Sequence, residues 1–367
     1  MVSEIKLLME QIVKPLVVTY GELRGSCFNL PDDKYGIASY ILTPSRIKAL
    51  LECPFVQDDN TVAFYLVLVD DVIVGRETYF TSKMKIGDEV VDVESASAFE
   101  VDKNYRRLAV GADIVMATFT RSKLFIGAGV SPMALPLDRK LKFHILEFPR
   151  LMSVRNSRSI LETKHLAFLA SLINVPLHLY NNIIINKARR LSKRFQIQKV
   201  SIVPEWIDDI VLKDGHKYAE YHNHEWLQWN LDNNFRGDIH DTQSFYCVFI
   251  DNSPIGFYML KERFRKVAGG KLKNVIIGSI VEWGTANETL LSEADAVLLS
   301  LLNFSPNVDI IEMATSDLKT VKTIKRHGFL SYGKANIVFK DRTKMYKDAS
   351  DISLWRVRFG YGDLILT

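Results

Sequence analysis

The stretch Phe99-Glu-Val-Asp-Lys-Asn-Tyr-Arg-Arg-Leu-Ala-Val-Gly-Ala-Asp-Ile-Val115 decides how this chain is interpreted. It predicts a strand that ends near Val101, a short polar turn, and a helix that begins near Arg107. Small residues, among them Ala109 and Gly111, occupy the first turns of that helix. A helix N-terminus has unpaired N–H groups and a positive dipole end, so the stretch predicts a site for an anion.

Within this stretch, Tyr105-Arg-Arg-Leu-Ala-Val-Gly111 resembles motif A of the GNAT superfamily of acyl-CoA N-acyltransferases, Arg/Gln-x-x-Gly-x-Gly/Ala. Arg106 takes the Arg/Gln place and Gly111 the last Gly, whereas Ala109 stands where the first Gly is usual. The resemblance implies that backbone N–H groups of the loop hold the CoA pyrophosphate, and that the preceding strand pairs with the pantetheine arm. The residues it assigns to acyl-CoA binding are Phe99, Val101, Arg106, Arg107, Leu108, Ala109, Val110, Gly111 and Ala112.

The order of elements around this motif occurs twice. Residues 61–75 and 245–257 each contain two β-rich runs joined by a polar turn, which predicts a hairpin. The strand and helix predicted after each hairpin are 90–101 and 107–123 in the first copy, and 274–283 and 286–303 in the second. Strands mixed with helices predict an α/β class with an α+β mixed sheet. The resemblance implies two tandem GNAT-like acyl-CoA N-acyltransferase domains.

The chain divides into three segments on this basis. Residues 1–156 are predicted to form an N-terminal GNAT-like domain with the acyl-CoA site, and residues 242–367 a C-terminal GNAT-like domain. Residues 157–241 are predicted to be a helical connecting segment. Trp226 and Trp229 are three apart, so on a helix they share a face, and we expect them to dock this segment onto a domain.

The second half keeps one family signature and lacks another. Gly328-Phe329 matches the common Gly-Phe of GNAT proteins. Where motif A should be, the sequence is Glu282-Trp-Gly-Thr-Ala-Asn-Glu-Thr-Leu-Leu-Ser-Glu-Ala-Asp295. Thr285 and Glu288 have the spacing of a capping box, which would satisfy the helix N-terminus internally, and Glu288 would repel a pyrophosphate. We therefore expect the second half not to bind CoA in the usual way.

The catalytic side chains that the resemblance implies are harder to place. A Glu on the fourth GNAT strand often serves as general base, but its position falls near residues 95–97, where there is no Glu. Glu94 is the nearest upstream and is assigned as the base; Glu100, downstream, stays an alternative. The family Tyr that protonates the leaving thiolate is also missing, because Leu137-Asp138 occupies its region. Tyr180, Tyr361 and water stay open as substitutes.

The resemblance therefore implies transfer of an acyl group, most simply acetyl, from CoA to an amine of a small acceptor by direct attack. Two alternatives of other classes remain. One is a Fem-like aminoacyl transferase that uses aminoacyl-tRNA, which is the reading in which a nucleic acid would be a partner. The other is a binding module that kept the GNAT fold and lost the chemistry.

Composition limits the partners further. The net charge of +4, from 47 basic and 43 acidic residues, is too small for bulk nucleic-acid binding. The three cysteines, Cys27, Cys53 and Cys247, have no paired spacing, which fits a reducing cytoplasm and neither a disulfide framework nor a zinc site. The N-terminus lacks a signal-peptide pattern, and no apolar stretch was expected to span a bilayer, so no membrane partner is predicted.

Four histidines and one basic run in the sequence do not indicate a function. His216, His222, His224 and His240 suggest a metal, but His222 and His224 do not share a helix face and no carboxylate or Cys spacing completes a site, so no metal is predicted. The basic run Lys187–Arg194 could touch RNA or an anionic membrane. A run of charge on a helix is commonly a solvated face, and we expect this role here.

Overall fold

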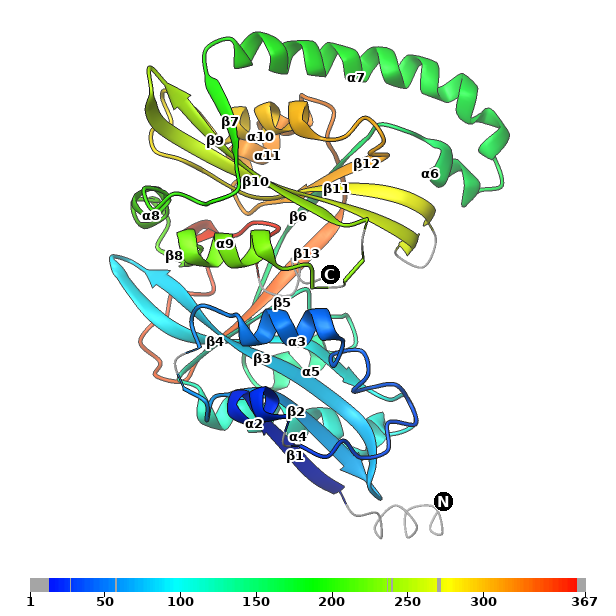
Figure 1. Cartoon of the computed structure of the whole chain (residues 1–367), viewed down its shortest axis with the longest axis vertical. Helices are drawn as coiled ribbons and strands as arrows, with labels where there is room; N and C mark the ends of the chain where they lie inside the picture. Colours follow the sequence, from blue (N-terminus) through cyan, green and yellow to red (C-terminus); the bar gives the residue numbers. More distant parts are fainter. Residues whose placement is uncertain are drawn as a thin grey trace.

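The computed structural model describes residues 13–26, 28–56, 58–235, 237–238, 240–268 and 272–361, with the backbone alone for residues 118–121. Both halves of the chain contribute to one continuous mixed sheet with helices on both faces (Figure 1). The sheet runs from the N-terminal half at one end of the molecule to the C-terminal half at the other.

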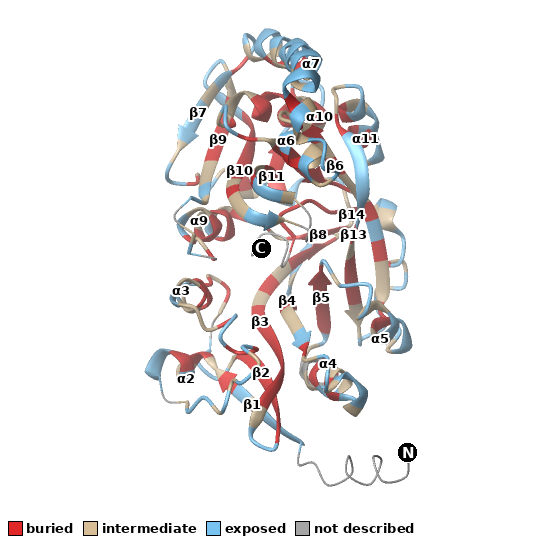
Figure 2. Ribbon diagram, turned by 90° about the vertical axis from the view of Figure 1, so that its right-hand side faces the viewer, coloured by how far each residue is buried: buried red, intermediate tan, exposed pale blue. Residues whose placement is uncertain are grey.

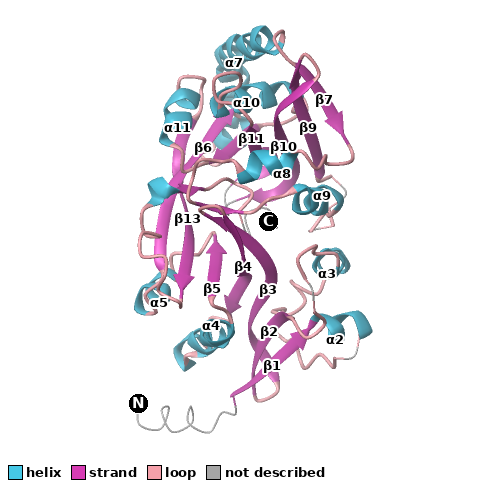
Figure 3. Cartoon of the chain, turned by 90° about the vertical axis from the view of Figure 1, so that its left-hand side faces the viewer, coloured by secondary structure: helices cyan, strands magenta, loops and turns pink. Residues whose placement is uncertain are grey.

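The N-terminal half supplies one end of the sheet. Its strands, paired in chain order, are β1 (Val13–Thr19), β2 (Val62–Val69), β3 (Val72–Ile86), β4 (Glu89–Val101) and β5 (Leu124–Ala128). Its helices are α2 (Tyr20–Gly25), α3 (Pro44–Leu51), η1 (Arg106–Leu108), α4 (Val110–Arg121) and α5 (Leu135–Lys140). The helices α2 and α3 lie on one face of the sheet, and α4 and α5 lie on the other (Figures 2 and 3).

The rest of the chain supplies the other end. Its strands are β6 (His144–Val154), β7 (Gln196–Val200), β8 (Tyr218–Glu220), β9 (Thr242–Ile250), β10 (Ser253–Ala268), β11 (Leu272–Thr285), β12 (Ile310–Ala314), β13 (Leu330–Asp341) and β14 (Trp355–Arg356). Its helices are α6 (Arg158–Glu162), η2 (Ala167–Leu169), α7 (Ala170–Ser192), α8 (Ile207–Leu212), α9 (His224–Asp232), α10 (Glu293–Ser300), η3 (Leu301–Asn303), α11 (Leu318–Lys325) and η4 (Ile352–Leu354).

The two predicted hairpins are β2–β3 and β9–β10. Each turns on two adjacent residues with positive φ, Asp70 and Asp71 in the first and Asp251 and Asn252 in the second. Positive φ at both central residues is the geometry of a type I′ turn, which Asp and Asn tolerate and which matches the twist of the strands. The same local chemistry therefore builds the same unit twice.

The two halves exchange strands at the centre of the sheet. The order there is β5-β13-β6-β12, so β13 from the end of the chain pairs with β5, and β6 from the first segment pairs with β12. The two exchanged strands also pair with each other along most of their length. Strand pairing thus crosses the boundaries 1–156, 157–241 and 242–367, and their status as separate folding units stays a prediction.

The connecting segment lies between the halves. Trp226 and Trp229 on α9 share a buried apolar cluster with Ala49 and Phe80 of the N-terminal half and Phe257 of the C-terminal half. The indole of Trp229 donates a hydrogen bond to the carbonyl of Ala49 at 2.8 Å. The prediction that the two tryptophans dock this segment onto a domain is confirmed, and the contact reaches both halves.

The described cysteines are buried thiols. Cys53 and Cys247 are both free, and burial raises the pKa of the Cys53 thiol to about 11 and that of Cys247 to about 12. Neither is therefore a thiolate near neutral pH. Cys27 lies outside the described residues. Over the described ranges, no group of His, Cys, Asp and Glu side chains could hold a metal ion.

Candidate active site

The site begins where two parallel strands separate. Strands β4 and β5 pair at only three positions, from Glu94 opposite Phe125 to Ala96 opposite Gly127. A bulge lies just beyond these pairs: the register between β3 and β4 shifts around Glu77, and Ala98 has a positive φ of 54°. A bulge bends and re-aims a strand. The outer part of β4, with Phe99, consequently leaves β5.

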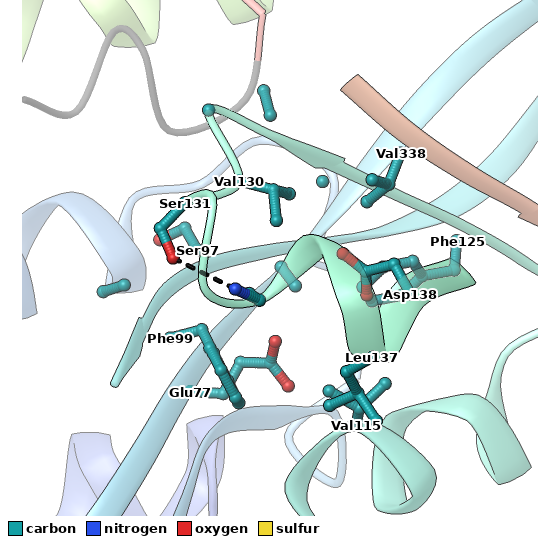
Figure 4. A pocket seen from close by; sticks show the side chains of 16 residues that line it. Glu77, Ser97, Phe99, Val115, Phe125, Val130, Ser131, Leu137, Asp138 and Val338 are labelled. Carbon is teal, nitrogen blue, oxygen red and sulfur yellow. Dashed lines mark hydrogen bonds between the residues drawn. The ribbon is translucent and has the colours of Figure 1, made fainter. Parts of the chain in front are cut away.

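The opening between the strands contains a cavity of about 150 Å³. Figure 4 shows its lining, which comes from β3, β4, β5, the first turns of α5 and the adjoining turn of α4. Val338 on the exchanged strand β13 closes one side. The labelled side chains in the lining are Glu77, Ser97, Phe99, Val115, Phe125, Val130, Ser131, Leu137, Asp138 and Val338. The cavity is mostly apolar with a few polar groups, as ligand sites are.

The helix that follows β4 begins at the mouth of this opening. Ala109 has a left-handed φ of 60°, and α4 begins at the next residue, Val110. A Cβ added at Gly111 would lie 3.2 Å from the ring of Phe99 and 3.6 Å from Val101. Gly111 is therefore the point where the helix approaches β4 most closely. The N–H groups of the first helical turn lie beside the separated strand.

The positive φ of Ala109 explains why the GNAT pattern has Gly at this place, since a side chain in the left-handed region costs about 1–2 kcal/mol. We expect Ala109→Gly to raise the free energy of unfolding by roughly 0.5–1 kcal/mol, after the entropy cost of the added Gly. The matched control is Ala112→Gly, within α4, which should lower it by about 1 kcal/mol. Urea denaturation measures both, and equal losses would contradict the role of Ala109.

The residues assigned to acyl-CoA binding lie together, with different exposures. Arg106 is turned back onto β4, where its Nε donates to the carbonyl of Val101 at 3.1 Å. Arg107 is exposed, Leu108 packs against the apolar cluster under α4, and the side chain of Val110 is fully buried. Side chains such as Val110 thus fix the start of the helix against the core. The role of all these residues in binding stays a prediction.

Glu94 lies elsewhere. It lines a second cavity of about 400 Å³ together with Tyr79, Thr81 and Lys123, and it is not among the residues that line the β4–β5 opening. The carboxylate in the opening is that of Glu77 on β3, which is 3% exposed and accepts a hydrogen bond from the Tyr79 hydroxyl at 2.5 Å. No sequence pattern indicated Glu77, because its place depends on the bulge.

The opening contains a second carboxyl group, Asp138 on α5. It is 6% exposed, and its Oδ2 and the hydroxyl of Ser97 are buried without a hydrogen-bond partner within the described part of the chain. Burial in these apolar surroundings raises the pKa of Asp138 to about 6. Asp138 lies where the resemblance leads one to expect a Tyr. The sequence therefore indicated this position but did not indicate an acidic role for Asp138.

The raised pKa of Asp138 gives a pH-dependent prediction. The folded state holds the proton more tightly than the unfolded state, so the ionised carboxylate destabilises the fold as the pH rises through about 6. We expect Asp138→Asn to increase the free energy of unfolding by on the order of 1–3 kcal/mol above about pH 7, with the gain shrinking towards pH 4. The control is Asp92→Asn at an exposed position of β4, for which urea denaturation should show no such pH dependence.

The corresponding place in the C-terminal half has the same strand geometry. Strands β11 and β12 pair in parallel at three positions, Ile277 to Ser279 opposite Ile310 to Glu312, and the register between β10 and β11 shifts just beyond, at Met259 and Leu260. The strand residue just beyond this shift, Trp283, points into the core. Trp283 is fully buried, and the Arg358 guanidinium stacks on its ring at 4.3 Å.

A buried ionic network surrounds this position. Arg358 donates to Glu282 at 3.1 Å and also binds Glu293. His222 bridges Glu282 at 2.5 Å and Glu220 at 3.1 Å, and all three side chains are fully buried. Burial alone would raise the pKa of Glu282, but the hydrogen bond from His222 and the charges of nearby arginines lower it to about 2. His222 is therefore a structural bridge between segments.

The helix after β11 also differs from the prediction. It begins at Glu293 and not near 286, because β11 extends to Thr285 and a turn follows. The N-cap is Ser292, which accepts from the N–H of Asp295, while Glu288 accepts from the N–H of Glu293 at 3.0 Å. The capping box predicted at Thr285 was thus wrong in position. The inference that the helix N-terminus is satisfied by neighbouring side chains holds.

The comparison with solved structures shows the fold. The chain has the fold of the GCN5-related N-acetyltransferase (GNAT) superfamily, in a tandem arrangement in which each half contains two parallel strands that pair at three positions. Among solved structures, a GCN5-related N-acetyltransferase from Anabaena variabilis matches with a TM-score of 0.55 and 9% identity, over 90% of this chain and 73% of that one.

Two further structures match with comparable scores. N-myristoyltransferase from Saccharomyces cerevisiae with bound myristoyl-CoA has a TM-score of 0.54 at 9% identity, over 90% of this chain and 82% of that one. Eis1 from Mycobacterium abscessus has a TM-score of 0.50 at 10% identity, over 92% and 76%. No protein-family model and no curated protein sequence matches this chain. Identities this low establish the fold and leave the substrate open.

Proposed function

We propose that this protein is an acyl-CoA-dependent N-acyltransferase whose acyl-CoA site is the β4–β5 opening of the N-terminal half. The observation that carries the proposal is the contrast between the halves. The N-terminal opening contains a cavity beside a helix N-terminus, whereas just beyond the corresponding shift in the C-terminal half Trp283 is fully buried with Arg358 stacked on its ring, and we infer that these two side chains fill the second opening. A single chain that kept one opening and filled the other is best explained by one ligand site.

In this proposal the N–H groups at the start of α4 bind the CoA pyrophosphate, because a helix N-terminus favours anions. The edge of β4 from Phe99 to Val101, which β5 does not pair, binds the pantetheine arm as an added strand would. The acyl group occupies the cavity. An N-myristoyltransferase of the same fold has been solved with myristoyl-CoA, which supports an acyl-CoA here without defining the acyl group.

The transfer proceeds by attack of an amine nitrogen on the thioester carbonyl carbon. The C–N bond forms, the C–S bond breaks, the ammonium loses a proton and the CoA thiolate gains one. Asp138 is the group in the opening suited to donate that proton, since a pKa of about 6 keeps a fraction protonated near neutral pH. Glu77 is the carboxylate placed to accept the proton of the amine; Glu94, in the second cavity, would act only after a rearrangement.

The small amine acceptor is proposed to approach from the opposite face of the sheet. A cavity of about 20 Å³ there is lined by Arg46 and Leu50 of α3, Trp229 of α9 and the hydroxyl-bearing residues Thr78 and Ser97. Ser97 lines this cavity and the β4–β5 opening alike. The acceptor would therefore meet the thioester beside Ser97, between the two halves.

Calorimetric titration with acetyl-CoA and with longer acyl-CoA molecules tests the proposal, followed by an assay of thiol release with a panel of amines. We expect saturable binding and amine-dependent release, with Asp138→Asn lowering turnover more than binding. Binding without release under any amine would favour the non-catalytic alternative. No binding at millimolar ligand would remove the acyl-CoA proposal and direct the work to aminoacyl-tRNA.

A further inference from the structure

The long helix α7 forms one end of the molecule, away from the N-terminal half (Figure 1). Its inner face packs on α10 and η3, and its buried residues are Ala170, Ile184 and Ala188. Near its middle, Tyr180 and Ile184 lie against Gly328 at the end of α11. These contacts fix α7 as a surface helix of the C-terminal half.

The outer face of α7 and the preceding turn is apolar. Five large side chains, which we call the outer stripe, follow one another three or four residues apart and so share one face. They are Phe168, Leu172, Val175, Leu179 and Ile183, exposed by 76%, 73%, 61%, 63% and 56%. A surface helix ordinarily has a polar outer face. An apolar stripe on the side away from the core therefore indicates a contact surface.

By length and composition, Ala167–Ser192 is apolar enough to cross a membrane, and 11% of the scored window is buried. The expectation that no apolar stretch is long enough to span a bilayer was wrong, because Asn and His residues interrupt the apolar residues of this stretch. Core helices of globular proteins meet the same test, but they are mostly buried. Since Ile184 and Ala188 hold one face of α7 on the C-terminal half, the fold leaves the other face for contact along the helix and not for a crossing.

The charge around α7 has one sign. Residues 163–204 contain no Asp or Glu. The basic side chains of this stretch are Lys164, Lys187, Arg189, Arg190, Lys193, Arg194 and Lys199. None of them forms an ion pair with any residue that the structure describes. Most of this charge lies at the C-terminal end of α7, directly after the outer stripe.

The end of α11 extends this basic surface. Lys322, Lys325 and Arg326 are exposed there, and burial together with the charge of Lys187 lowers the pKa of His327, with Asp295 acting in the opposite sense. Lys187 and the end of α11 therefore form one positive region.

We propose that α7 lies flat on a lipid surface that contains anionic phospholipids. The outer stripe enters the boundary between headgroups and acyl chains, and the basic end of the helix binds lipid phosphates. A second copy of the chain is disfavoured, because residues 163–204 contain no acidic side chain that could pair with the basic end of another copy. RNA would bind the basic end and leave the apolar stripe in water. The proposal does not depend on the acyltransferase activity.

Flotation of the full chain with phospholipid vesicles tests the proposal. One vesicle contains equal parts of phosphatidylglycerol and phosphatidylcholine, and the other contains phosphatidylcholine alone. We expect binding to the first and at least about tenfold weaker binding to the second. Leu172→Glu with Leu179→Glu should weaken binding by more than about tenfold, and Arg190→Glu with Lys193→Glu by at least about tenfold. The matched control is Met345→Glu, which is 71% exposed outside α7 and should bind like the unaltered protein.

All these positions are exposed, so the variants should unfold at unchanged temperature, which excludes loss of fold as the cause. Sedimentation of the unaltered protein in the absence of lipid distinguishes the other occupants. A dimer that Leu179→Glu dissociates, with no vesicle binding, would overturn the proposal in favour of a second copy. If the protein bound RNA through the basic end of α7 and bound no vesicles, that result would overturn the proposal in favour of a nucleic acid.

Discussion

Gly111→Glu is expected to reduce acyl-CoA binding by at least about a hundredfold. A Cβ at this position already lies 3.2 Å from the Phe99 ring, so a larger side chain requires Phe99 or α4 to shift. The added carboxylate also stands at a helix N-terminus where a pyrophosphate would bind, and like charges in such a site cost several kcal/mol. Calorimetric titration with acetyl-CoA gives the dissociation constant directly.

The control for this variant is Gly333→Glu on β13. An added Cβ there meets no atom within 4 Å, and the backbone does not have a positive φ. It introduces the same charge into the same chain, so its binding constant should stay within about twofold of the unaltered protein. Full binding by Gly111→Glu would show that the anion does not lie at the start of α4, whatever the second variant does.

Arg358→Ala is expected to lower the free energy of unfolding by about 3–5 kcal/mol, because it leaves buried carboxylates without their counter-charge. Arg358 is 1% exposed and binds both Glu282 and Glu293. Burial raises the pKa of Glu293, and the charge of Arg358 acts against that rise. Without Arg358, folding would therefore require Glu293 to take up a proton. The midpoint of urea denaturation near neutral pH measures the loss.

A surface pair provides the comparison. Lys319 and Glu288 approach to 3.4 Å with side chains that are 77% and 48% exposed, and Lys319→Ala should change the free energy of unfolding by less than about 1 kcal/mol. If Arg358→Ala lowered the free energy of unfolding equally little, the network would be relaxed or hydrated in solution. The argument that this network fills the second opening would then fail.

The sequence predicted those parts of the fold that depend on residues close together in the chain. The hairpins follow from Asp70-Asp71 and Asp251-Asn252, whose turn chemistry is local. The β4–α4 unit follows from the small residues after the strand. The helix start at Glu293 was missed because β11 extends to Thr285, the residue predicted as the cap, and Ser292 caps the helix seven residues later.

The residues assigned to acyl-CoA binding lie together in the structure, and their role stays a prediction, as does that of Glu94; the carboxyl groups in the opening, Glu77 and Asp138, were not assigned from the sequence. Backbone groups at Ala109 to Gly111 were inferred from a contiguous motif. Glu77 became part of the opening through a bulge between β3 and β4, which no residue pattern marks. Asp138 was noted as a departure from the family and not as an acid, since its pKa depends on the apolar walls that fold around it.

Because β6 and β13 are exchanged between the halves, the two halves share one sheet and each depends on strands of the other. A fragment that ended at residue 156 would have β5 and β6 but no β13 between them. It would also lack Val338, and with it one wall of the cavity. Each fragment would carry bare strand edges, which promote aggregation. Two fragments produced together could restore each other by complementation, so we expect the duplicated whole to fold as one unit.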